Sequence, residues 1–170
     1  MRILGIDPGS RVTGFAVVEA RGNRLRACGF GVIRPASAEL PQRLGEIFDG
    51  VGEVIEALKP VALAIESVFL ARNAQSALKL GQARGAAICA ATRAGLPVFE
   101  YAPRAVKLAV VGSGRAEKAQ IQHMMRQILQ IEETLPADAA DALAVAVCHA
   151  HTRHTLAYAS RHAVAAAPRP

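Results

Sequence analysis

Four carboxylates stand at positions where a folded chain can use them for chemistry. Asp7 and Glu66 each end a short apolar run that is typical of a buried strand. Asp138 and Asp141 lie three residues apart at the start of a predicted helix, so they share one face of it. An ionised carboxylate beside apolar residues is costly unless a cation meets it. A metal ion, a basic side chain or a ligand is therefore expected nearby, although Asp7 taken alone fits a simple turn cap equally well.

The four acids converge on one point if the two strands are neighbours and the helix packs over them. Oxygen ligands of this kind suit Mg²⁺ or Mn²⁺ better than softer metals. Two such ions about 4 Å apart activate a water and stabilise the departing oxygen in an in-line phosphodiester displacement. Each acid singly is more often a cap or a surface charge. The set of four at element ends favours a metal site.

Apolar periodicity predicts the elements that must position these acids. We expect strands over 3–7, 12–18, 24–34, 61–66 and 97–101, and helices over 40–58, 73–94, 103–110, 117–131 and from 136 onward. The first three strands should form an antiparallel meander around the Pro8-Gly9 turn. Strand and helix alternate in the remainder, which indicates an α/β fold.

Gly81 and Gly85 lie four apart inside the helix predicted over 73–94, where each weakens the helix by roughly 1 kcal/mol relative to alanine. Glycines at this spacing usually mark close backbone approach. The neighbour is either another helix of the same chain or the same helix of a second subunit, and both remain open at this point.

Composition limits the classes of protein. The chain has 170 residues, of which 52% are hydrophobic, enough for one sizeable core. Its formal net charge of +6 favours an anionic partner, nucleic acid before acidic metabolites. No apolar stretch approaches the length of a membrane span, and Met1-Arg2 leads into a strand rather than a signal peptide, so we expect a cytoplasmic protein without membrane contact.

The cysteines and histidines suggest no second metal site. Cys28, Cys89 and Cys148 are odd in number and lie in apolar contexts, so we expect reduced core residues. A zinc site is one interpretation of Cys148, His149, His151 and His154, but their spacing follows no standard pattern, and histidines near the C-terminus of a helix are the simpler account. From the sequence we expect a nuclease domain over 1–152 and a basic, disordered tail over 153–170.

With these elements in place, the sequence resembles the RuvC family of bacterial Holliday junction resolvases from Ile3 to about His151. The resemblance rests on the segments Gly5 to Gly14, Ile65-Glu66 with Val68-Phe69, Asn73-Ala74, Ser76 to Gly85, Ala116 to Lys118, and Ala137 to Ala144. It implies an RNase H-like fold, a five-stranded mixed sheet flanked by helices, and a homodimer. It also implies Mg²⁺, with Mn²⁺ as a substitute and two ions per site, on Asp7, Glu66, Asp138 and Asp141. The implied reaction is paired symmetric nicking of a four-way DNA junction in recombination and repair, alongside the branch-migration complex RuvAB.

Further roles come from the same resemblance. Lys107 and Lys118 match basic residues that would hold the scissile phosphate and neutralise charge in the transition state. Phe69 matches an aromatic that would stack on an unpaired base, worth about 1–3 kcal/mol. Five more cations are candidate phosphate contacts, with solvated surface as the alternative for each: Arg72, Lys79, Arg84, Arg104 and Arg115. Ser67 stands where the family often has Gln, so loop contacts to DNA can differ.

Three other functions are weighed against this one. The segment Gly5 to Ser10 also resembles the first phosphate loop of actin-like ATPases and sugar kinases, but that class needs a second domain, for which 170 residues leave no space. An RNase H-like nuclease of structured RNA, as in ribosomal RNA precursors, shares both sheet and acids. A non-catalytic junction-binding protein is the third alternative, and the presence of all four acids speaks against it.

Overall fold

The structure is a computed structural model that describes residues 1–67 and 73–165, with side chains described as far as Arg153. Its centre is a five-stranded mixed sheet in the order β3-β2-β1-β4-β5. The strands are β1 (Arg2–Asp7), β2 (Thr13–Arg21), β3 (Arg24–Ile33), β4 (Ala62–Glu66) and β5 (Val98–Tyr101). The first three pair antiparallel, while β4 runs parallel to both β1 and β5. The predicted meander and the predicted fold class are confirmed.

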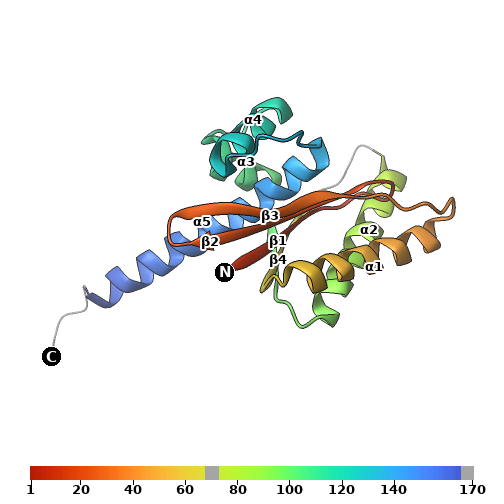
Figure 1. Cartoon of the computed structure of the whole chain (residues 1–170), viewed down its shortest axis with the longest axis horizontal. Helices are drawn as coiled ribbons and strands as arrows, with labels where there is room; N and C mark the ends of the chain where they lie inside the picture. Colours follow the sequence, from red (N-terminus) through yellow and green to blue (C-terminus); the bar gives the residue numbers. More distant parts are fainter. Residues whose placement is uncertain (68–72, 166–170) are drawn as a thin grey trace.

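Helices cover both faces of this sheet (Figure 1). Their bounds are α1 (Leu40–Leu58), α2 (Ala74–Arg93), α3 (Pro103–Val111), α4 (Lys118–Leu129) and α5 (Ala137–Ala165). Helices α1 and α2 pack together on one face. Helix α5 lies directly on the opposite face, and α3 and α4 pack against it.

The alternation of side chains along β1 decides which residues meet which helices. Leu4 and Ile6 belong to the core on the α1 and α2 face, whereas Ile3 belongs to the core on the α5 face. Successive strand residues point to opposite faces, so Gly5 and Asp7 share the face of Ile3. Asp7 therefore points toward α5.

Two glycines let α5 lie unusually close to the sheet. A Cβ atom at Gly5 would overlap the carbonyl oxygen of Ala142, and one at Gly14 would overlap the carbonyl oxygen of Asp138. Since no side chain stands between them, the first turns of α5 rest on the backbone of β1 and β2. Small residues on α5, such as Ala139 and Ala146, are fully buried and keep this contact tight.

The backbone of α5 is helical as far as Ala165, and the last residues of the predicted tail, 166–170, lie outside the described part of the chain. Alanine is the strongest helix former, and its abundance after residue 153 sustains the helix without an apolar stripe. The domain boundary at residue 152 stays a prediction. No helix among the described residues has the length and apolar character needed to cross a bilayer.

The structure corrects one further expectation, on the cysteines, and excludes one of the two alternatives left open for Gly81 and Gly85. Cys148 is buried and Cys28 half-buried, but Cys89 is exposed on α2 and is no core residue. A Cβ atom at Gly81 or Gly85 would meet nothing within 4 Å, so close packing of these glycines inside one chain is excluded among the described residues.

Candidate active site

The first two acids lie side by side at one edge of the sheet. Ile6 of β1 pairs with Ile65 of β4, and each strand places its acid at the next position. Neighbouring parallel strands are about 4.8 Å apart, so the backbones of Asp7 and Glu66 are adjacent. Ala64 belongs to the α5 face, so Glu66, two residues on, points to that face as Asp7 does.

The other two acids come from the start of α5, above the same edge. Gly14 is the cross-strand partner of Asp7 and lies against the backbone of Asp138. Asp141 follows one helical turn later on the same face. The backbones of all four acids therefore lie at the same edge of the sheet, while their role as one metal site stays a prediction. The sequence alone left this placement conditional on strand order and helix placement.

The turn between β1 and β2 is held by a buried threonine. The Thr13 hydroxyl donates to the carbonyl oxygen of Gly9 at 2.8 Å and accepts from the Gly9 amide at 3.3 Å. This clamp fixes the backbone that leaves Asp7. The sequence analysis did not single out Thr13, and its only signal was a hydroxyl residue four positions after a turn glycine.

Electrostatics show that the acids share one environment. Burial raises the pKa of Asp7 to about 7, and the negative charges of Asp141, Glu66 and Asp138 add to the increase, while Lys118 opposes it. The pKa of Glu66 is also raised, first by burial and then by Asp141, against the opposing charges of Lys107 and Lys118. The site therefore carries more negative charge than its own side chains neutralise.

Two lysines supply part of the missing positive charge. Lys118, the first residue of α4, places its Nζ 3.1 Å from Oδ2 of Asp141. The hydrogen bond and charge of Asp141 raise the pKa of Lys118, which keeps it protonated. Lys107 on α3 is near enough to Glu66 to lower the pKa of that carboxyl. Lys118 is thus paired with Asp141, and Lys107 acts on Glu66 through its charge, while the roles predicted for both lysines toward the substrate stay predictions.

The chemistry of these groups fits a hard divalent cation. Carboxylates that raise one another's pKa are relieved by a positive ion, and oxygen-only ligands favour Mg²⁺ or Mn²⁺. In the described residues, no three His, Cys, Asp or Glu side chains are already gathered as a metal cage. Asp7, Glu66, Asp138 and Asp141 are the residues that would hold such an ion, because the sheet register and the contact of α5 with Gly14 bring their backbones to one edge of the sheet.

The remaining cations fall into different surroundings. Lys79, Arg104 and Arg115 are exposed, as a phosphate contact requires. Arg84 is half-buried and contacts the protein itself: its Nε donates to the backbone oxygen of Glu66. Phe69 and Arg72 lie outside the described residues.

The histidines after Asp141 do not form a zinc site with Cys148 in the part of the chain that the structure describes. His149 is fully buried, its ring packs on Phe99, and its Nδ1 lies 2.7 Å from the Tyr101 hydroxyl. Burial lowers the pKa of His149 to about 4, so it is neutral at physiological pH. The side chain of His154 is outside the described set.

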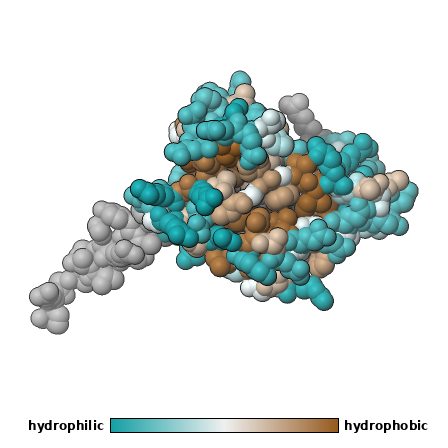
Figure 2. Space-filling model, viewed as in Figure 1, coloured by the Kyte–Doolittle hydropathy of each residue, from teal (hydrophilic) through white to brown (hydrophobic). Residues whose placement is uncertain are grey.

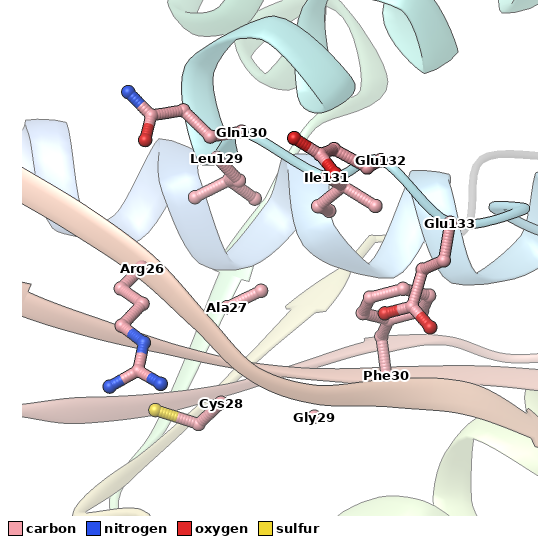
Figure 3. A pocket seen from close by; sticks show the side chains of 10 residues that line it. All are labelled: Arg26, Ala27, Cys28, Gly29, Phe30, Leu129, Gln130, Ile131, Glu132 and Glu133. Carbon is pink, nitrogen blue, oxygen red and sulfur yellow. The ribbon is translucent and has the colours of Figure 1, made fainter.

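A separate groove of about 550 Å³ lies between β3 and the turn after α4. Figure 3 shows Phe30 and Ala27 of β3 on the side of the sheet that faces Leu129 and Ile131, whereas Cys28 points to the other side. Apolar residues also gather over this side of the sheet, between α4 and α1 (Figure 2). None of the four acids lines this groove, so it is not the candidate active site.

An RNase H-like sheet with clustered acids at the ends of adjacent strands defines a class, the metal-dependent nucleases built on that fold. Within it, the family described as crossover junction endodeoxyribonuclease RuvC matches residues 3–149. The chain belongs to the RuvC family.

Individual relatives support the same family assignment. The crossover junction endodeoxyribonuclease RuvC of Shewanella amazonensis is 59% identical over 154 residues, which cover 91% of this chain and 89% of that protein. The structure of T. thermophilus RuvC in complex with Holliday junction substrate superposes with a TM-score of 0.85 at 38% identity, covering 91% of this chain and 96% of that one. The yeast mitochondrial Holliday junction resolvase Ydc2 shares the fold, with a TM-score of 0.63 at 11% identity, over 92% of this chain and 82% of that one.

Proposed function

We propose that this chain is an endonuclease that resolves four-way DNA junctions by hydrolysing phosphodiester bonds, with Mg²⁺ as its cofactor. The observation that carries the proposal is the gathering of Asp7, Glu66 and Asp141 beside Lys118 at one edge of the sheet, in a chain of the RuvC family. Relatives with this name and a solved junction complex support the substrate.

The four acids would hold the cation, two ions being the number that suits a phosphodiester displacement. When bound, divalent cations supply an activated water and stabilise the departing oxygen. Asp7 would be the central ligand, because the charges of the other three acids all act on its carboxyl and raise its pKa. Its half-buried position limits the access of bulk water and so strengthens charge interactions in the site.

The lysines act on the substrate. Lys118 is 78% exposed at its side chain although it is paired with Asp141, so it can turn toward a phosphate that enters the site. Lys107 approaches from α3, on the Glu66 side. Protonated amines at these two positions would bind the scissile phosphate and offset the charge that develops during hydrolysis. The exposed side chains of Arg104 and Arg115 extend the positive surface toward the neighbouring phosphates.

A homodimer would explain paired symmetric nicks, because a two-fold protein presents two equal sites to a two-fold junction. Its interface would be the open face of α2. Gly81 and Gly85 have no neighbour within 4 Å of a Cβ position, and Leu78 on the same helix is 68% exposed. Coupling to the branch-migration complex RuvAB and a cytoplasmic location remain predictions from the family.

The test is incubation of the purified chain with a four-way DNA junction, a DNA duplex of the same sequence and a structured RNA, each with Mg²⁺ and with chelator. We expect Mg²⁺-dependent paired nicks in the junction and little cleavage of duplex or RNA. Preferential RNA cleavage would favour the RNA-nuclease alternative. Tight junction binding without cleavage in Mg²⁺ or Mn²⁺ would favour a non-catalytic binding protein.

A further inference from the structure

The peptide group that follows Glu66 is held from two sides. The amide of Ser67 donates to the carbonyl oxygen of Tyr101 on β5 at 2.9 Å, and the Ser67 hydroxyl reaches the same oxygen at 3.2 Å. The carbonyl of this peptide group belongs to Glu66. It accepts from Nε of Arg84 on α2 at 3.1 Å.

The sheet itself leaves this carbonyl without a donor. Because the amide of the peptide group points to β5, its carbonyl points the opposite way, toward β1. Ile6 pairs with Ile65, so the backbone amide of residue 8 would donate to the Glu66 carbonyl if the parallel ladder continued. Residue 8 is Pro8, which has no N–H. Arg84 supplies the hydrogen bond that the ladder cannot.

A second acid orients the Arg84 side chain. Its Nη2 is buried and lies 2.6 Å from Oε2 of Glu100, an ion pair whose angles fall short of a hydrogen bond. On β5, Val98 packs against the core on the α1 and α2 face. Glu100 comes two residues later, so its side chain points to the same face. The guanidinium thus joins α2 to the ends of β4 and β5 from the face opposite the acids.

We infer that Arg84 is a positioning residue that holds the end of β4 so that Glu66 faces the metal site. It acts through the backbone of Glu66, since its charge is not among the groups that shift the pKa of the Glu66 carboxyl. This role replaces the phosphate contact predicted for Arg84. In the same arrangement, Glu100 orients the Arg84 guanidinium. The inference rests on the proposed metal-dependent function.

The variants that test it are Arg84→Met, Arg84→Lys and Glu100→Gln, with Arg93→Met, exposed at the end of the same helix, as the matched control. Mn²⁺ binding is measured by electron paramagnetic resonance. Junction affinity in chelator and thermal unfolding without metal are measured in parallel. We expect Arg84→Met to weaken Mn²⁺ binding roughly tenfold, the size of one lost supporting contact at a metal site, with junction affinity changed less than about threefold. Arg84→Lys and Glu100→Gln should fall between wild type and Arg84→Met, because each keeps part of the arrangement.

Lower thermal stability of Arg84→Met with unchanged Mn²⁺ binding would reduce Arg84 to a structural ion pair and overturn the inference. Weaker junction binding with unchanged Mn²⁺ binding would restore the phosphate contact and overturn it as well. The proposed function is judged on the wild-type chain alone, and it fails if wild type binds no Mn²⁺ and nicks no junction. If wild type does both and Arg84→Met binds Mn²⁺ as wild type does, only the inference about Arg84 fails.

Discussion

At the residue scale, Asp7 is the acid whose ionised form a bound cation would stabilise most. The pKa of a carboxyl rises when its ionised form is penalised, and for Asp7 the rise to about 7 reflects burial first and three acidic neighbours second. In the metal-free protein the ionised carboxylate is therefore destabilising. Stability tied to Asp7 is highest below pH 4 and is lost as the pH rises through about 7.

From this sign follows a prediction for Asp7→Asn, which mimics the neutral acid. Without metal, the variant should be more stable than wild type at pH 8, by roughly 1–3 kcal/mol, and the difference should shrink toward pH 4. Denaturant unfolding in chelator at pH 5 and 8 measures it, with the exposed Asp49→Asn on α1 as control. A variant less stable than wild type at pH 8 would show that Asp7 is not strained by its neighbours.

Lys118 supports a second prediction at this scale. Its charge lowers the pKa of Asp7, so its removal should raise that pKa further. In Lys118→Met, the pH at which Mn²⁺ binding is half lost should move upward relative to wild type, and Lys79→Met, exposed on α2, should leave it in place. An unchanged midpoint for Lys118→Met would mean that the lysine serves the substrate alone.

At the element scale, the site depends on how closely α5 lies on the sheet. Gly14→Ala would push a methyl group into the backbone of Asp138, and overpacking of this kind costs roughly 1–3 kcal/mol. We expect lower stability together with weaker Mn²⁺ binding, because the first turn of α5 must move away from Asp7. Gly45→Ala on α1, where a Cβ meets nothing within 4 Å, should instead be neutral or stabilising. Normal stability of Gly14→Ala would contradict the close contact.

The elements also show what the sequence can and cannot predict. Apolar runs ended by Asp7 and Glu66, and the helix over 40–58, were readable because strand and helix periods are local properties. The role of Arg84 was not, because it depends on Pro8, which directly follows β1, and on the register between β1 and β4. The extent of α5 beyond His151 was not readable for a related reason: an alanine-rich helix needs no apolar stripe, so periodicity gave no signal there.

At the scale of the whole molecule, the open face of α2 is the feature that a single chain does not explain. Exposed Leu78 and Cys89 share it with the two glycines, and helix faces of small and apolar residues pack against one another when two copies meet. Each protomer would then contribute one complete acid cluster. Two such clusters would account for symmetric nicks.

The corresponding prediction uses Gly85→Gln. A Cβ atom at Gly85 meets nothing within 4 Å in one chain, so we expect folding to be preserved, whereas the glutamine side chain would obstruct a second copy. We expect monomers by light scattering and loss of paired nicking. Gly52→Gln on α1, equally open in the single chain, should remain dimeric. Dimers that form normally with Gly85→Gln would place the interface elsewhere.

The central claim is that carboxylates gathered at the edge of the sheet hold the cations that hydrolyse junction DNA. Its most direct measurement is single-turnover nicking of a labelled four-way junction by Asp7→Asn and wild type in Mg²⁺, at concentrations where both are fully bound. We predict a loss of about 1,000-fold or more with junction affinity preserved, since several kcal/mol of transition-state stabilisation depend on the ions. Nicking by Asp7→Asn within about tenfold of wild type would contradict the claim.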